Sequence, residues 1–390
     1  MRRGRLRARA VLVTQRVVQR AVRLATPLAL ALALSACAFK VDKPKPKPLL
    51  PLKTQIAGKV VWSARTSEVM FPLSVAVNGS TFTVANSNGT VLALDAASGR
   101  ELWRGTAGAA LSAGVGSDGR VAAVVTRDGR VVALEAGRVL WRQSMTTRVV
   151  TAPLVAGERV FVVGIDRSVT AFDAQNGSLL WTVQRGGDAL TLSQTGVAAA
   201  FKDTLLVGQG PRLAGLDPST GAVRWDVALA SPRGSNEVER LADLVGPPAR
   251  VGDLVCARAF QAAVACVNAE RGSLLWTKPV GGRQGVAADE KNVYAADASD
   301  RITAWALASG EIAWASDALL YHELSTPFSL GATVVFGDVE GQLHFLSADT
   351  GAAQLRLPTD GTPIAAAPVT SGNTVLVVTR NGGLFALRAE

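Results

Sequence analysis

The sequence has few of the residues that usually build metal and redox sites. It contains two histidines and three cysteines in 390 residues, and no two cysteines are adjacent. His322 and His344 do not stand with cysteines in any zinc or haem ligand pattern. The apolar run at residues 24–36 is 13 residues long, which is too short to cross a bilayer as a helix. These absences argue against a metalloenzyme and against a helical membrane anchor in this run.

The positive charge of the chain is concentrated at its N-terminus. The formal net charge is +10, but residues 1–36 hold eight arginines and no acidic residue. Without that segment 33 basic and 31 acidic residues remain, and from Thr54 onward there are 28 basic and 30 acidic. A nucleic-acid-binding face would need a basic surplus in the folded body, so none is predicted.

Residues 1–36 read as a secretory signal, with a basic start followed by the apolar run. The run ends in Leu-Ser-Ala-Cys at residues 34–37, which resembles the lipobox of bacterial lipoproteins. We therefore expect Cys37 to carry a lipid, since two or three acyl chains anchor a protein stably. By the same resemblance, Ala38 in place of aspartate indicates the outer membrane. Residues 37–53, rich in alternating lysine and proline, are expected to form an extended tether.

A phrase of the form Ala-x-Asp-x-x-x-Gly-x-x-x-Trp recurs along the rest of the chain. Clear copies are VLALDAASGRELW, VTAFDAQNGSLLW, LAGLDPSTGAVRW and VACVNAERGSLLW, which begin at residues 91, 169, 213 and 264. With weaker copies, the phrase ends fall at residues 62, 103, 141, 181, 225, 276, 314 and 355. The mean interval of about 42 residues is typical of four-stranded propeller blades, and the short alternating apolar runs exclude a helical solenoid.

Each phrase reads as strand, turn, strand. Asp or Asn bends the chain through its side-chain oxygen, and Gly supplies the positive φ that a tight turn needs. The first phrase end, Trp62, has no strands before it, and the last unit stops near Leu387 with no phrase after it. We therefore predict an all-β fold, a single eight-bladed propeller over residues 54–390, in which the N-terminal strand completes the last blade.

Cys256 and Cys266 fall on either side of a predicted turn near Gln261. A cross-strand disulfide and two buried thiols both fit this placement, because cross-strand bridges need closely matched geometry.

The repeated phrase resembles those of pyrroloquinoline quinone dehydrogenases, and with the lipobox the whole mature chain resembles the BamB family of the outer-membrane β-barrel assembly (BAM) machinery. The resemblance implies a non-catalytic scaffold without cofactor, acting as a monomer within a larger complex. It implies binding to the POTRA domains of BamA, with contact to unfolded β-barrel proteins as a further possibility.

The resemblance also implies where the partner binds. A family motif Leu-x-Leu-Arg-Gly falls on residues 190–194, where Leu190 and Leu192 match and Ser193 replaces the arginine. An acidic family loop is matched by Glu237, Glu239, Arg240, Leu241 and Asp243, whereas a further family aspartate corresponds to Val245. The interval from Trp225 to Trp276 is 51 residues, about nine above the mean, and its excess lies in this loop. Long loops on a rigid scaffold are where function concentrates.

Two other functions remain as alternatives. A quinoprotein dehydrogenase would need a quinone, calcium ligands and often a vicinal disulfide, and the sequence contains no Cys-Cys pair. A propeller that binds an envelope polymer would need spare tryptophans, but seven of the eight are at the repeat position, and Trp305 is expected inside a strand. The aspartates Asp95, Asp173 and Asp217 are assigned to turns, and His344 to a hydrogen-bonded strand position.

Overall fold

The computed structural model describes residues 44–186, 190–232 and 234–389. The predicted signal peptide and Cys37 lie outside the described residues. The compact unit considered below begins at Pro46. Within the described part of the chain, no helix has the length and apolar character needed to span a membrane.

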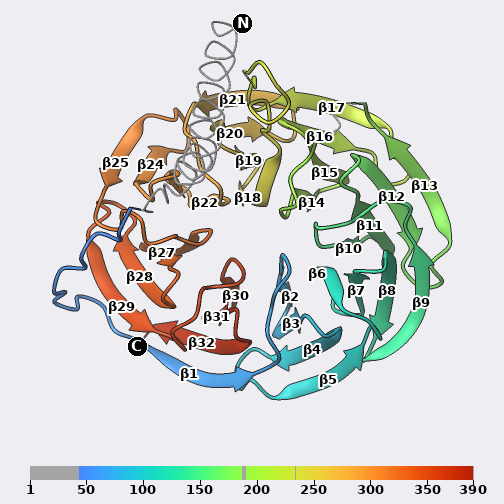
Figure 1. Ribbon diagram of the computed structural model, residues 1–390, viewed down its shortest axis with the longest axis horizontal. Coiled ribbons are helices and arrows are strands. Elements are labelled where there is room, and N and C mark those ends of the chain that lie inside the picture. The colour runs from blue at the N-terminus through green and yellow to red at the C-terminus, as the bar shows by residue number, and fades with distance from the viewer. Residues whose placement is uncertain (1–43, 187–189, 233, 390) are drawn as a thin grey trace, which may run out of the picture. The chain divides into compact units, whose positions relative to one another are not determined.

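The described residues form eight four-stranded antiparallel sheets arranged as blades around a ring (Figure 1), as predicted. The first four blades, from inner to outer strand, are β2 (Ala76–Asn78), β3 (Thr81–Ala85), β4 (Thr90–Asp95) and β5 (Glu101–Thr106); β6 (Leu111–Ser117), β7 (Val121–Thr126), β8 (Arg130–Glu135) and β9 (Arg138–Ser144); β10 (Leu154–Ala156), β11 (Arg159–Val163), β12 (Ser168–Asp173) and β13 (Leu179–Gln184); and β14 (Ala198–Phe201), β15 (Thr204–Gln209), β16 (Arg212–Leu216) and β17 (Val223–Ala228). The next three are β18 (Leu244–Val251), β19 (Leu254–Ala259), β20 (Ala263–Asn268) and β21 (Ser273–Lys278); β22 (Ala287–Ala288), β23 (Asn292–Ala296), β24 (Ile302–Ala306) and β25 (Ile312–Ser316); and β26 (Phe328–Leu330), β27 (Thr333–Gly337), β28 (Gln342–Ser347) and β29 (Ala353–Pro358).

The last blade joins the two ends of the ring. Its strands are β30 (Val369–Ser371), β31 (Thr374–Val378), β32 (Gly383–Ala389) and, outermost, β1 (Gly58–Arg65). Strand β1 is antiparallel to β32, with Gly58 opposite Ala389 and Trp62 opposite Ala386. The predicted closure by the N-terminal strand is confirmed, and the pairing covers the edge that β32 would otherwise expose.

The repeated tryptophan joins neighbouring blades. Trp141 Nε1 donates a hydrogen bond to the Ala174 carbonyl of the following blade at 2.9 Å. Its indole lies so close to Gly177 that a Cβ there would be 2.6 Å from the ring. Equivalent bonds run from Trp62 to Ala96, Trp181 to Pro218, Trp276 to Leu307 and Trp314 to Ala348. The phrase glycine is therefore required twice, for its positive φ and for the tryptophan that covers it.

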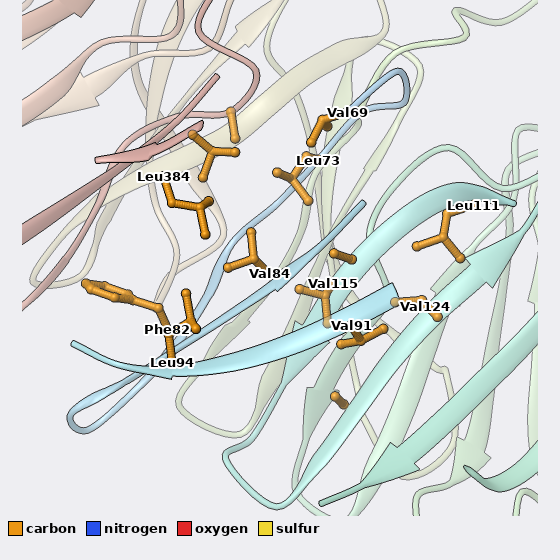
Figure 2. Packing of buried hydrophobic residues seen from close by; sticks show 14 of the residues in the cluster. Val69, Leu73, Phe82, Val84, Val91, Leu94, Leu111, Val115, Val124 and Leu384 are labelled. Carbon is orange, nitrogen blue, oxygen red and sulfur yellow. The ribbon is translucent and has the colours of Figure 1, made fainter. Parts of the chain in front are cut away.

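The core lies between the blades, because the second and third strands of each are buried on both faces. Figure 2 shows one such cluster, in which Val84 and Val91 of the first blade lie near Val124 of the second and Leu384 of the last. Trp305 is buried within β24, as predicted. The repeat aspartates shape turns, as Asp173 does by accepting bonds from the amides of Gln175 and Asn176.

A disulfide joins Cys256 on β19 to Cys266 on β20. The two residues are directly opposite in the register, with Cα atoms 4.0 Å apart, and both are buried. Of the two alternatives compatible with the sequence, the structure contains the bridge.

Candidate functional site

The topology separates the connections onto two faces of the ring. The links from an outer strand to the next inner strand share one face with the turns between second and third strands; we call this the loop face. The two longest such links are residues 185–197, after β13, and residues 229–243, after β17. They belong to neighbouring blades (Figure 1) and contain every predicted partner-binding residue.

One hydrogen bond connects these links directly, and a second joins the first link to β18. The Leu192 amide donates to Asp243 Oδ2 at 2.7 Å, and the Gly246 amide donates to the Thr195 carbonyl at 2.8 Å. Burial raises the pKa of the Asp243 carboxyl, while the Leu192 amide and then the Arg167 charge act in the opposite direction. The structure therefore brings Leu192 and Asp243 together in one surface. The half-buried Asp243 side chain connects the two segments.

Glu239 organises the turn at residues 235–241. Its carboxylate accepts hydrogen bonds from the Ser235 amide at 2.7 Å and from Asn236 Nδ2 at 2.9 Å, and its own amide donates to Asn236 Oδ1 at 2.9 Å. The bonds from Ser235 lower the pKa of Glu239 most. The side chain is exposed but already bonded within its own loop, while Arg240 and Leu241 beside it are half-buried.

Leu190 and Val238 are exposed apolar side chains of this surface. Leu190 is 38% exposed, and Val238, which the sequence reasoning missed, is 67% exposed. Val238 stands between two glutamates, and an apolar residue inside a charged loop was the signal that could have identified it. Two of the positions that depart from the family pattern differ from each other: Ser193 is exposed, whereas Val245 is buried on β18 opposite Arg258.

A small cavity of about 50 Å³ is lined by residues of both links, including Leu192 and Asp243, and by Arg167. The Arg167 guanidinium, from the turn between β11 and β12, packs on Gly210, where an added Cβ would lie 3.6 Å from it. Arg167 is the second residue that sequence reasoning missed, because it comes from a turn that no motif marks.

An ion-pair network connects the chain segments from which the two links begin. Asp226 on β17 binds Arg185, which follows β13, and accepts a hydrogen bond from Arg212 Nε on β16 at 2.8 Å. Burial opposes the ionisation of Asp226, but the two arginines outweigh it and lower the pKa of this carboxyl. The network fixes the start of one link relative to the start of the other.

The two histidines share a buried aspartate elsewhere on the loop face. His344 Nε2 lies 2.8 Å from Asp338 Oδ2, and His322 Nδ1 lies 3.8 Å from the same oxygen. His344 is thus a hydrogen-bonded strand residue on β28, as predicted. Among the residues described, no group of three or more His, Cys, Asp or Glu is placed to hold a metal ion.

Comparisons with known proteins agree with this architecture. The family model described as outer membrane protein assembly factor BamB matches residues 55–113 and 87–316. The BamB of Burkholderia pseudomallei is 37% identical over 359 residues, which cover 91% of this chain and 94% of that protein. The BamB of Bordetella pertussis is 36% identical over 378 residues, covering 95% and 98%.

Solved structures with the same fold include BamB from Moraxella catarrhalis, with a TM-score of 0.77, 22% identity and coverage of 85% of this chain and 99% of that one. The quinohemoprotein alcohol dehydrogenase of Comamonas testosteroni has a TM-score of 0.65 at 15% identity, covering 85% and 76%. These two likenesses concern the fold alone. The sequence relationships decide the family: the chain belongs to the outer membrane protein assembly factor BamB family.

Proposed function

We propose that this protein is a non-catalytic lipoprotein scaffold of the BAM complex, which binds the POTRA domains of BamA through its loop face and assists the insertion of β-barrel proteins. The observation that carries the proposal is the Leu192–Asp243 hydrogen bond. It unites, on one surface, the two segments that the family resemblance assigns to partner contact.

The chemistry of this surface suits a protein partner. Exposed Leu190 and Val238 offer side chains that a partner pocket can bury, and half-buried Arg240 and Leu241 lie in the same loop as Val238. Arginine is among the residue types that contribute most to binding, and neighbouring contacts help by excluding water from it. The rigid ring beneath them lowers the entropy cost of ordering the loops on binding.

The anchor in this proposal is a lipid on Cys37 in the outer membrane, which places the propeller in the periplasm. The lipobox motif and Ala38 support this assignment. Labelling with a radioactive or clickable fatty acid would test it, since Cys37→Ser should abolish incorporation.

Site-specific photo-crosslinking in the native envelope tests the partner. Probes at Leu192 and Arg240 should capture BamA, whereas a probe at Lys202, on the opposite face, should not. Leu192→Arg should also weaken binding of purified POTRA fragments from the same bacterium while circular dichroism remains unchanged. Capture of BamA only from Lys202 would show that the wrong face has been assigned.

A further inference from the structure

Part of the segment expected to form an extended tether lies against the ring. We call the residues from Pro46 to Ile56 the docked segment. The Lys47 amide donates to the Leu320 carbonyl at 3.0 Å, and Lys47 Nζ lies 3.2 Å from Asp317 Oδ1. At the other end, the Gln55 amide donates to the Gln354 carbonyl at 2.9 Å. Figure 1 shows this segment in blue, passing outside β29 before β1 begins.

Apolar contacts hold the docked segment between these ends. Leu49 packs against the core cluster that includes Trp314 and Leu346, and Ile56 packs against the cluster that includes Leu355. The adjacent Leu50 is 78% exposed. The segment therefore presents one residue of the Leu49–Leu50 pair to the ring and leaves the other in solvent.

His322 indicates that the ring is built to receive this segment. Its side chain is 4% exposed, its Nδ1 has no hydrogen-bond partner, and its Nε2 donates to the Lys47 carbonyl at 2.9 Å. The Lys47 carbonyl of the docked segment thus supplies the hydrogen bond that a buried polar side chain needs.

The loop that carries His322 is held in an unfavourable backbone conformation. Tyr321 and Glu323 have φ angles of 63° and 52°, in the left-handed region that non-glycine residues rarely adopt. Asp300 stabilises this shape by accepting hydrogen bonds from the amides of Glu323, at 2.7 Å, and Leu324, at 3.2 Å. Such strain persists where surrounding contacts enforce it, and it often marks a binding site.

The docked segment changes the face at which the chain leaves the ring. Strand β1 begins at Gly58, opposite the end of β32, and therefore on the face away from the loops. Lys47 instead contacts residues 317–322, which link β25 to β26 on the loop face. From Lys47 to Gln55 the segment thus crosses the height of the ring.

We propose that the docked segment is a strap that stays fixed to the ring, so that the chain leaves the ring at the loop face. A lipid on Cys37 would then orient the partner-binding loops toward the membrane. The orientation rests on the proposed lipid at Cys37. Nine residues from Cys37 to Pro46 reach at most about 30 Å, whereas 21 residues from Cys37 to Gly58 would reach about 70 Å and permit either face to approach the bilayer.

Two matched variants test the strap on the mature chain. Leu49→Glu should release the segment, and Leu50→Glu should leave it docked, because only Leu49 is covered by the ring. The Lys53–Thr54 bond should be cut by trypsin at least tenfold faster in the Leu49→Glu protein, with unchanged melting of the propeller. Equal cleavage rates in the two variants would overturn the strap, whether or not POTRA binding is observed.

Fluorescence quenching tests the orientation with lipidated protein on vesicles that carry nitroxide headgroups. A fluorophore on Val238→Cys, at the loop face, should be quenched more than one on Lys202→Cys, at the opposite face, and Leu49→Glu should reduce this difference. Equal quenching at both positions with a protected Lys53–Thr54 bond would overturn the orientation while leaving the strap. Failure to associate with vesicles would overturn the lipid anchor on which the orientation rests.

Discussion

Leu192 and Asp243 are 51 positions apart in the sequence, yet the amide of one donates to the carboxylate of the other at 2.7 Å. The bond connects the links that follow two neighbouring blades. This contact and the arginine network of Asp226 hold the two links together as one surface.

Removal of the Asp243 carboxylate should weaken partner binding without unfolding the ring. We expect Asp243→Ala to lower the affinity for POTRA fragments about tenfold, or ~1.4 kcal/mol, because the Leu192 loop loses its support. Asp243→Asn keeps an acceptor oxygen and should lose less. Isothermal titration would measure both, with Glu270→Ala on the opposite face as the control; an unchanged affinity for Asp243→Ala would contradict the supporting role.

Alanine substitutions at two glycines with similar backbone angles should lower the free energy of unfolding by different amounts, because a tryptophan covers only one of them. Gly177 and Gly157 lie in the same blade with φ of 74° and 57°, but a Cβ at 177 would meet Trp141 at 2.6 Å, whereas nothing lies within 4 Å of one at 157. Gly157→Ala should cost about 1 kcal/mol for the left-handed backbone alone. Gly177→Ala should cost about 2–4 kcal/mol because overpacking is added. Equal losses in denaturant unfolding would show that the indole yields freely.

Reduction of the Cys256–Cys266 bridge should destabilise the propeller by about 2–3 kcal/mol, the loop-entropy value for a closed loop of this length. The bridge spans a sequence separation of 10 and lies in the core between β19 and β20. Denaturant midpoints with and without reductant would measure the effect. The Cys256→Ala/Cys266→Ala protein should be insensitive to reductant, and two free thiols in the native protein would refute the pairing.

Asp226 should make stability depend on pH in acid. The pKa of its carboxyl is lower in the folded protein than in the unfolded chain, so its contribution is present above the unfolded value and is lost as pH falls through the folded one. Asp226→Asn should cost about 1–2 kcal/mol at neutral pH, a value reduced for the partial exposure of Arg185 and Arg212. The difference from the unaltered protein should disappear near pH 2; a difference that persists there would assign the loss to packing.

The blades could be predicted from sequence because their signals are local. The Asp, Gly and Trp of each phrase act within one turn or against the next copy, so a single periodic pattern specifies eight blades and the closing role of Trp62. Cys256 and Cys266 could be placed on facing strands, but the bond between them depended on a register that alternation alone does not fix.

The surface was less accessible to sequence reasoning. The two links could be identified, but not the bond between Leu192 and Asp243, since it depends on the conformations of two irregular segments. The hydrogen bonds of Glu239 within its own loop and the exposure of Val238 could not be predicted for the same reason. The composition of the docked segment predicts extension but does not encode the site on the ring that His322 completes.

The closure of the ring has a consequence for how the chain folds. Seven blades each form from one continuous stretch, whereas the last joins residues 58–65 to residues 383–389, more than 300 positions away. Contacts of such separation carry the largest loop-closure entropy and form slowly. Among the described strands, β1 is synthesised before the others but must wait for β32, and the ring closes only when these two strands pair.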